Sequence, residues 1–306
     1  NGYRLSSLFN DELILGSFLF RFFPIVIGLI FLFLNDFKIK IITLTLTSLV
    51  FGFIIILSGE RTAIFLFLSY LLILSLLKTE NRIFFLTILL FFISLFIILV
   101  SNNKNIEKRI VNYTLNQILE KKIEKNDAMY NDEIDLNFFL SKIENLKLND
   151  LSIFSIQHEV IYRTALKIFN DNKITGIGPK NFREVCKQKK YQTFTSKDNS
   201  VNGCSTHPHN THLQILTETG IIGYFLFILI YMKIINLIIK KDLRLGSINK
   251  NLKFLQLSCL ITIFLSLFPL IPSGNIFNNY YSNLIYLPVA IYLAIELSKK
   301  TKEKNI

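Results

Sequence analysis

The sequence lacks the short motifs that mark several large enzyme classes. It contains no GxxxxGK phosphate-binding loop, no GxSxG nucleophile elbow, no HExxH zinc motif and no protein-kinase motif set. Only three cysteines occur, and they form no paired CxxC pattern of the kind that structural zinc sites use. No internal repeat of about 20–50 residues is present. These absences argue against a nucleotide-dependent enzyme.

Long apolar runs, in contrast, are abundant, and hydrophobic residues make up 51% of the 306 residues. A membrane-spanning helix needs about 20 mainly apolar residues. Seven runs approach this length, and they cover residues 13–34, 40–58, 62–77, 83–100, 212–239, 254–271 and 281–297. The third run is short for a span, and the fifth is long enough to tilt or to begin outside the lipid. We therefore predict an all-α polytopic membrane protein with about seven transmembrane helices.

Acidic residues are scarce, with 22 Asp and Glu against 34 Lys and Arg, which gives a net charge of +12. Outside residues 101–211, most basic residues gather in four places, which are residues 38–40, 78–82, 240–253 and 299–304. Threading seven spans brings all four groups to one side, which the positive-inside rule identifies as cytoplasmic. The charge therefore indicates membrane topology, and we expect no nucleic-acid partner.

The same threading predicts three parts. Residues 1–100 would hold four spans with an external hairpin tip at 58–62, and residues 101–211 a helical loop domain on the periplasmic or external side. Residues 212–306 would hold three spans and a basic cytoplasmic tail. Because residue 1 is not methionine and no signal peptide precedes it, we infer a fragment that lacks an odd number of upstream spans or a cleaved leader.

Two features of the loop domain predict local structure. Residues 154–169 contain no glycine or proline and are predicted to form a helix. Residues 176–182, GIGPKNF, form a Gly/Pro turn whose backbone N–H groups could be exposed. Cys186 and Cys204 lie in the same domain and could pair in an oxidising compartment, whereas Cys259 lies inside a span.

Three arginines are candidates for function. Arg21 interrupts the first apolar run, where a charge is costly and either faces a cavity or reaches water at the interface. Arg61 lies at the hairpin tip, where a charge can bind an anion or merely anchor the turn. Arg163 follows Glu159 by four residues, a spacing that also permits an ordinary surface ion pair on a helix.

Three of the four histidines, His207, His209 and His212, fall within the stretch 205–224. Zinc needs three or four ligands in tetrahedral geometry, and HxHxxH is not a standard zinc spacing. Cys204 could join such a site only if it is not paired with Cys186, and we expect no metal and no cofactor. Arginines and a histidine on one face suit an anionic substrate such as a diphosphate, since arginine binds phosphate oxygens and histidine accepts protons.

The histidine stretch also carries a family resemblance. His209-Asn210, nine further residues and then Gly220-Ile221-Ile222-Gly223 resemble the H-[N/S/Q]-x9-G-x-x-G signature of the O-antigen ligase and polymerase superfamily. CSTHP before it, SGER at the hairpin tip, YRTALKIFNDNKITGIGPKNF and the opening RLSSLFNDELILGSFL resemble the same family in order and spacing. One departure is that the family often has R-x3-L where Arg61 is followed by TAIF.

This resemblance implies a GT-C-type membrane glycosyltransferase in the bacterial inner membrane, with its active face on the periplasmic side. Such enzymes take a glycan from undecaprenyl diphosphate and need neither metal nor nucleotide. Ligases pass the glycan to lipid A-core, and polymerases pass it to a second lipid-linked glycan. The ligase is the favoured hypothesis here. A membrane solute transporter is the alternative from another class, although broken helices and mid-membrane polar groups are expected there.

By matching position, the resemblance also assigns roles. His209 would be the general base, and Arg61 and Arg163 would hold the diphosphate. The supporting candidates are His207, Asn210, Glu218 and Arg21.

Overall fold

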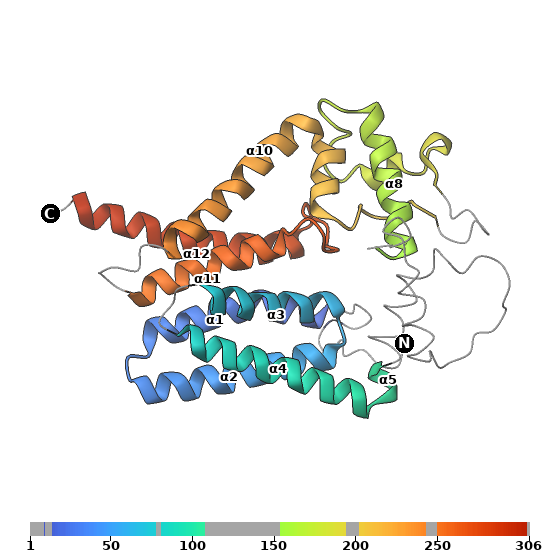
Figure 1. Cartoon of the computed structure of the whole chain (residues 1–306). Coiled ribbons are helices and arrows are strands. Elements are labelled where there is room, and N and C mark those ends of the chain that lie inside the picture. The colour runs from blue at the N-terminus through green and yellow to red at the C-terminus, as the bar shows by residue number, and fades with distance from the viewer. Residues whose placement is uncertain are drawn as a thin grey trace.

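The structure is a computed structural model, and it describes residue 9 and residues 14–77, 81–107, 154–193, 202–242 and 250–304. These residues form helices and connecting loops, with no β-strand among them (Figure 1). The helices are α1 (Leu15–Phe33), α2 (Phe37–Ser58), α3 (Arg61–Leu76), α4 (Arg82–Asn102), α5 (Lys104–Glu107), α8 (Ile156–Asp171), α9 (Phe182–Val185), the 3-10 helix η4 (Lys189–Tyr191), α10 (Thr211–Asp242), α11 (Lys250–Ser266) and α12 (Asn279–Lys304).

A helix occupies each of the seven predicted spans. Five of these helices are long and apolar enough to cross a membrane, namely α1, α2, α4, α10 and α12. The apolar helix α3 has 16 residues and α11 has 17, so both are shorter than the usual span. Twelve residues of α11 are buried, because α11 packs against α1, α3, α10 and α12. The predicted polytopic all-helical fold is confirmed.

The seven helices run up and down, so their connections gather at two ends (Figure 1). One end, on the left of Figure 1, holds the α1–α2 connection, the last residues of α3, α10 and α12, and the first residues of α4 and α11. Basic residues of these groups that the structure describes, such as Lys40, Arg82 and Lys250, therefore share this end. The assignment of this end to the cytoplasmic side stays a prediction. The opposite end holds the α2–α3 turn, the start of α1 and the end of α11, and we call it the site end.

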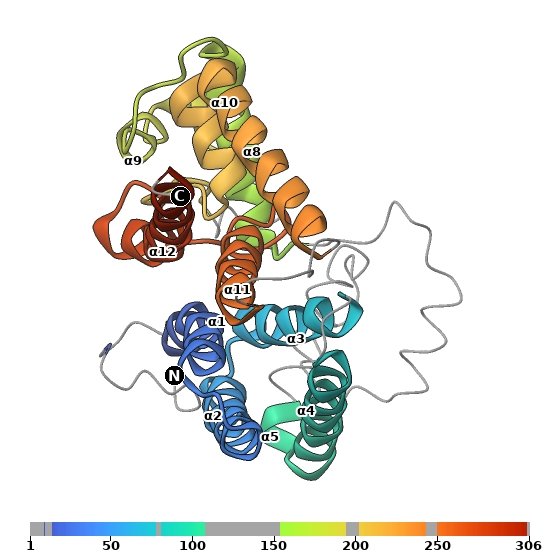
Figure 2. The ribbon, with the colours of Figure 1, turned by 90° about the vertical axis from the view of Figure 1, so that its left-hand side faces the viewer.

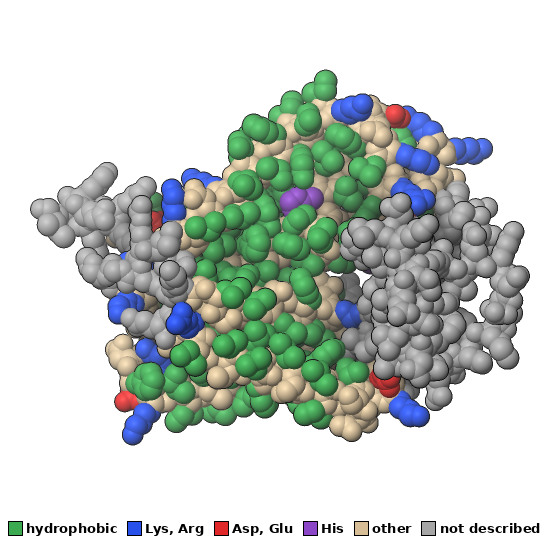
Figure 3. All heavy atoms as spheres, viewed as in Figure 1, with side chains coloured by type: hydrophobic (Ala, Val, Ile, Leu, Met, Phe, Trp, Pro, Cys, Tyr) green, Lys and Arg blue, Asp and Glu red, His purple; other side chains and the backbone are tan. Residues whose placement is uncertain are grey.

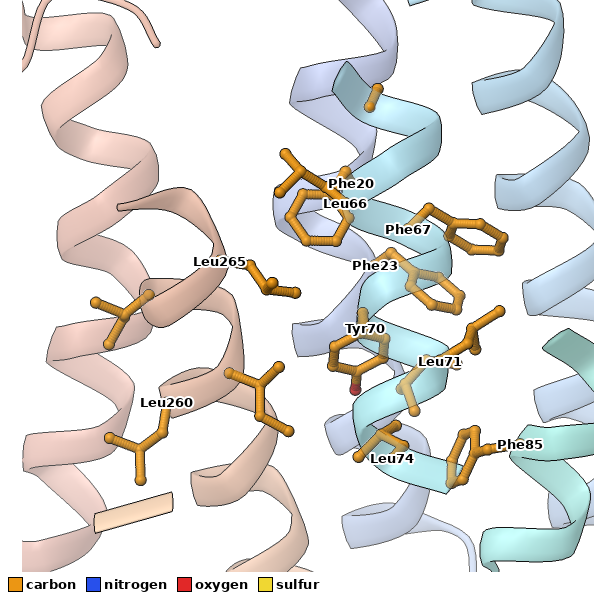
Figure 4. Packing of buried hydrophobic residues seen from close by; sticks show 14 of the residues in the cluster. Phe20, Phe23, Leu66, Phe67, Tyr70, Leu71, Leu74, Phe85, Leu260 and Leu265 are labelled. Atoms are coloured by element: carbon orange, nitrogen blue, oxygen red, sulfur yellow. The ribbon is translucent and has the colours of Figure 1, made fainter. Parts of the chain in front are cut away.

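The bundle is held by close packing of apolar side chains. Viewed along the helices, α11 lies between the α1–α4 group and the pair α10 and α12 (Figure 2). Phe20 and Phe23 of α1 and Phe67 of α3 pack in this core, together with Leu260 of α11 (Figure 4). Lipid tails are as apolar as these side chains, so packing rather than water exclusion favours the association. Hydrophobic side chains also cover the middle of the outer face, which suits a lipid environment (Figure 3).

Helix α10 is bent at Gly220, where the backbone has φ 68° and ψ −169° (Figure 1). The stretch before this glycine packs on α8, and the stretch after it continues as the long apolar helix. The run 212–239 thus consists of a leading segment and a long apolar helix, and whether that helix tilts or begins outside the lipid stays a prediction. The leading segment carries the candidate site.

Candidate active site at the site end

The α2–α3 turn is a rigid support for Arg61. Gly59 takes the left-handed conformation with φ 62°, and α3 begins directly after Glu60. The Glu60 carboxylate is buried and accepts hydrogen bonds from the backbone N–H groups of Gly16 and Ser17, at 2.7 and 3.2 Å. An acidic group at a helix N-terminus satisfies free N–H groups and favours the helix dipole. Glu60 therefore locks the turn to α1 rather than merely keeping a tip in water.

Gly220, the first glycine of the GIIG stretch, allows two backbones to cross. Gly178 N donates to the Glu218 carbonyl at 2.8 Å, and Ile221 N donates to the Lys173 carbonyl at 2.8 Å. A Cβ atom on Gly220 would lie 2.2 Å from the Ile174 carbonyl oxygen, so no larger residue fits there without a backbone shift. The turn after α8 is thereby fixed on the leading segment of α10.

The supporting candidate Glu218 strengthens this crossing. Its carboxylate accepts from the backbone N–H groups of Lys180 and Phe182, at 3.0 and 3.2 Å, and from the Gln214 amide at 3.1 Å. The prediction that the amides of the 176–182 turn are exposed for substrate is therefore wrong for these two groups. They are bound because a buried carboxylate needs donors. Glu218 holds the turn in place.

The histidine stretch is fixed on the loop that follows α11. Asn210 caps α10 by accepting from Leu213 N at 3.0 Å, and its amide donates to the Pro269 carbonyl at 2.7 Å. His209 takes a left-handed backbone conformation, φ 54°, and its carbonyl accepts from Ser273 N at 2.9 Å. Such a conformation is uncommon for a residue other than glycine. The neighbouring hydrogen bonds hold His209 in it.

A disulfide joins Cys186, just after α9, to Cys204, just before the histidine stretch, with 5.1 Å between the Cα atoms. Both cysteines adjoin the small core of the loop domain, which includes Phe182 and Tyr191. The link therefore ties the histidine stretch to the 182–191 region. Cys259 is a free thiol buried in the bundle.

Three parts of the chain meet at the histidines. The His209 ring lies 4.1 Å from the His207 ring and 5.8 Å, edge to face, from the ring of His158 on α8, measured between centroids. Burial lowers the pKa of His158 to about 4, and the nearby His209 and the charge of Arg61 add to this effect. His158 of α8 and His209 of the histidine stretch are thus neighbours, and the charge of Arg61 of α3 reaches His158.

The imidazoles of this cluster are neutral at neutral pH. Burial lowers the pKa of His207 to about 4, with His209 and Arg183 lowering it further, and burial also lowers the pKa of His209. The His207 Nε2 lies 3.1 Å from the Ser273 carbonyl, so that His207 positions the stretch. His212 lies apart from this arrangement, because its two ring nitrogens face the Leu267 carbonyl at 2.8 Å and the Tyr224 hydroxyl at 3.3 Å.

Arg163 is placed differently from Arg61. It forms an ion pair with Glu159 on α8, and its side chain is 58% exposed. Five residues along an α-helix turn the side chain by about 140°, so Arg163 and His158 point in different directions. The ordinary surface ion pair permitted by the spacing is therefore present.

Arg21 does not reach water from the first span, since only 6% of it is exposed. Its NH1 group donates to the Ser17 carbonyl at 2.7 Å, and its guanidinium lies 4.9 Å from the centroid of the Tyr281 ring. Its Nε has no hydrogen-bond partner within the described ranges. The prediction that Arg21 reaches water is wrong, because its side chain is buried next to Tyr281 of α12, and Arg21 remains a buried cation.

The zinc alternative gains no support from the side chains that the structure describes, because no three of their His, Cys, Asp or Glu groups could hold a metal ion together. Sequence reasoning missed His158 and Arg183. The spacing of Ser155 and His158 at the start of α8 is a helix-capping pattern, and it offered the one local signal. No signal connected His158 to His209, which is 51 residues away in the chain.

Comparison with known families identifies the family of the chain. The sequence profile of the O-antigen ligase family matches residues 46–228, well over half of the chain, and this range includes Arg61, His158 and His209. A search of curated proteins found no match. With its helical membrane fold, its HN-x9-GxxG stretch and this match, the chain belongs to the O-antigen ligase family.

Proposed function

We propose that this protein transfers a glycan from undecaprenyl diphosphate to an acceptor on the periplasmic side of the bacterial inner membrane. The favoured acceptor is lipid A-core, which makes the protein an O-antigen ligase. The proposal rests on one observation at the site end, where His158 contacts His209 and the charge of Arg61 acts on His158. It combines a cation for a diphosphate with a neutral imidazole for a hydroxyl proton, at the edge of an apolar bundle.

His209 acts as the general base. Its Nε2 lies 3.0 Å from the Ser205 hydroxyl oxygen, and its Nδ1 has no hydrogen-bond partner in the part of the chain that the structure describes. If Nε2–H donates to Ser205, Nδ1 carries the lone pair and accepts the proton of the acceptor hydroxyl. The lowered pKa keeps this nitrogen unprotonated at neutral pH.

The arginines act on the leaving group. The acceptor oxygen forms a bond to the anomeric carbon, the bond from that carbon to the diphosphate oxygen breaks, and the electron pair moves onto the diphosphate. Arg61 stabilises this developing negative charge, which is often the largest contribution to catalysis. Arg163 would exchange its ion pair with Glu159 for the phosphate oxygens, because its exposed side chain is free to turn. No cofactor is required.

Two alternatives remain as outcomes of the experiment. An O-antigen polymerase would use the same groups with a second lipid-linked glycan as acceptor. A solute transporter would need polar groups along a path through the bundle. Among the described residues, polar pairs such as Tyr70 and Ser258 also occur in the bundle, but the hydrogen-bond network around Asn210, Gln214 and Glu218 lies at the site end, which favours the enzyme.

The experiment uses the protein in vesicles with an undecaprenyl-diphosphate-linked oligosaccharide and, separately, lipid A-core or a second lipid-linked glycan. Transfer to lipid A-core is expected, and His209→Ala should lower its rate about 10²- to 10⁴-fold. Gln157→Ala, an exposed neighbour on α8, is the matched control and should transfer normally. Extension of the lipid-linked glycan would identify a polymerase. Full transfer by His209→Ala would reject His209 as base, and solute uptake without transfer would support a transporter.

A further inference from the structure

His158 is a site residue that the proposed mechanism does not yet use. It lies in the first turn of α8, where its backbone N–H donates to the Ser155 hydroxyl oxygen at 3.4 Å. The same oxygen lies 2.7 Å from the ring Nδ1 of His158. Ser155 therefore fixes both the backbone and the ring of this histidine.

The ring of His158 lies beside the proposed base His209 and within the range of the Arg61 charge. It meets the His209 ring edge to face at 5.8 Å, and Arg61 is close enough for its charge to act on the ring. Tyr162, one turn further along α8, lies behind it with 6.0 Å between ring centroids. A substrate hydroxyl or phosphate held next to His209 is therefore also near His158.

The hydrogen bonds of His158 leave one ring nitrogen for a ligand. Nδ1 faces Ser155, whereas Nε2 has no partner among the described residues. Since the Ser155 oxygen already accepts the backbone N–H, its own hydrogen is free to point at Nδ1. The proton of the neutral ring then lies on Nε2. A partly buried donor without a protein acceptor requires a water or ligand oxygen.

We propose that His158 contacts the substrate directly, with its Nε2–H donating a hydrogen bond to an oxygen of the lipid-linked glycosyl diphosphate. This assignment rests on the proposed function and adds a third group to Arg61 and His209. The ligand class follows from the position of the donor, which lies beside a cation and next to the base.

The chemistry needs a hydrogen bond and no proton transfer. When the bond between the anomeric carbon and the diphosphate oxygen breaks, the electron pair moves onto that oxygen, and the Nε2–H stabilises it while keeping its proton. A neutral imidazole can polarise a substrate oxygen in this way. Burial, His209 and Arg61 keep the ring neutral, because together they lower its pKa to about 4. The proton of the acceptor hydroxyl still goes to His209.

The test compares His158→Ala, His158→Gln and the control Gln157→Ala in the vesicle assay, with donor and acceptor concentrations varied separately. Ser155 stays in every variant, so the cap of α8 is kept. His158→Ala should lower kcat about 10²-fold, as expected for the loss of one donor to a developing charge. The glutamine amide can donate from a similar position, so His158→Gln should retain activity within about tenfold of wild type. Thermal unfolding and the intact disulfide report folding.

Three results would overturn the assignment. Wild-type rates in His158→Ala would show that the ring makes no substrate contact. A folded His158→Gln as slow as His158→Ala would show that proton transfer, not donation, is needed. A rate loss that follows only a loss of folded protein would show a structural role. If the wild-type protein transfers glycan to neither acceptor, the proposed function itself fails, and this result does not depend on the His158 variants.

Discussion

The bundle and the site end use their side chains in different ways. In the bundle, positions such as Phe67, Leu71 and Leu74 are fully buried among other apolar residues, and shape alone selects them. At the site end, Gln214 donates to both Glu218 and Asn275, and its own oxygen accepts from Ile276 N at 3.1 Å. Apolar cores tolerate swaps of similar volume, whereas a buried polar group that loses its partner is costly. Single-atom changes should therefore matter far more at the site end.

Two glycines give the sharpest comparison, and the largest expected effect. Gly220→Ala places a methyl group 2.2 Å from a backbone carbonyl at a φ of 68°, where neither partner can easily move. Gly52→Ala in α2 places a methyl group 2.2 Å from the end of the Phe92 ring. Because this ring is a side chain that can shift, we expect the substitution to lower the stability of the fold by about 1–3 kcal/mol. We expect Gly220→Ala to abolish glycan transfer and Gly52→Ala to remain active.

Transfer rates and thermal unfolding of both variants in detergent would check this. An active Gly220→Ala together with an inactive Gly52→Ala would reverse the comparison. It would mean that the bundle, and not the backbone crossing, sets the geometry of the site.

The disulfide is the next test. The double variant Cys186→Ser, Cys204→Ser removes a link across a sequence separation of 18 residues, worth about 3 kcal/mol in the chain-entropy view. The lost stabilisation should affect the loop domain and not the bundle. Amide hydrogen exchange should therefore become faster in residues 182–193 and 202–210 and stay unchanged in the bundle. Cys259→Ala in α11 is the matched control. Equal protection of residues 182–193 and 202–210 with and without the link would contradict the expected role.

The neutral histidines predict a dependence on pH. In the folded protein, the pKa values of these histidines are lowered from the ordinary value of 6.5, and those of His158 and His207 fall to about 4. Between about pH 4 and pH 6.5 the unfolded chain therefore binds more protons than the folded protein. Stability should therefore be complete above pH 6.5 and fall as the pH drops toward about 4. Transfer should fail on the same acidic side, because protonated His209 cannot accept a proton.

Thermal unfolding and transfer rates measured from neutral to acidic pH would test both effects. A loss of transfer that already begins above the ordinary histidine pKa would contradict a buried neutral base.

The two regions also differ in what the sequence predicts. Apolar runs predicted every bundle helix, because hydropathy along the chain reports directly on burial in lipid. The bend of α10 was not located, since Gly220 takes its conformation from a crossing with residues 173–178 that no local pattern reveals.

Only part of the site was predicted, because the sequence pattern does not report contacts between distant elements. Its motif drew attention to His209 and Arg61, but His158 joins them only through folding. Likewise, the buried partners of Glu60 and Glu218 come from other elements, so their bracing roles could not be derived from composition or spacing.

Arg21 belongs to the bundle by position and to the site end by chemistry, and it gives the smallest expected effect. Among the described residues, its guanidinium has one backbone hydrogen bond, a tyrosine ring beside it and no partner for Nε, so the buried charge is incompletely compensated there. Replacing such a group with an apolar residue of similar length is often neutral or stabilising. Arg21→Met should thus raise stability by about 1 kcal/mol and slow transfer several-fold, because costly ionisable groups in membrane segments usually serve function. A destabilised variant with unchanged transfer would assign Arg21 to the packing of α1 against α12.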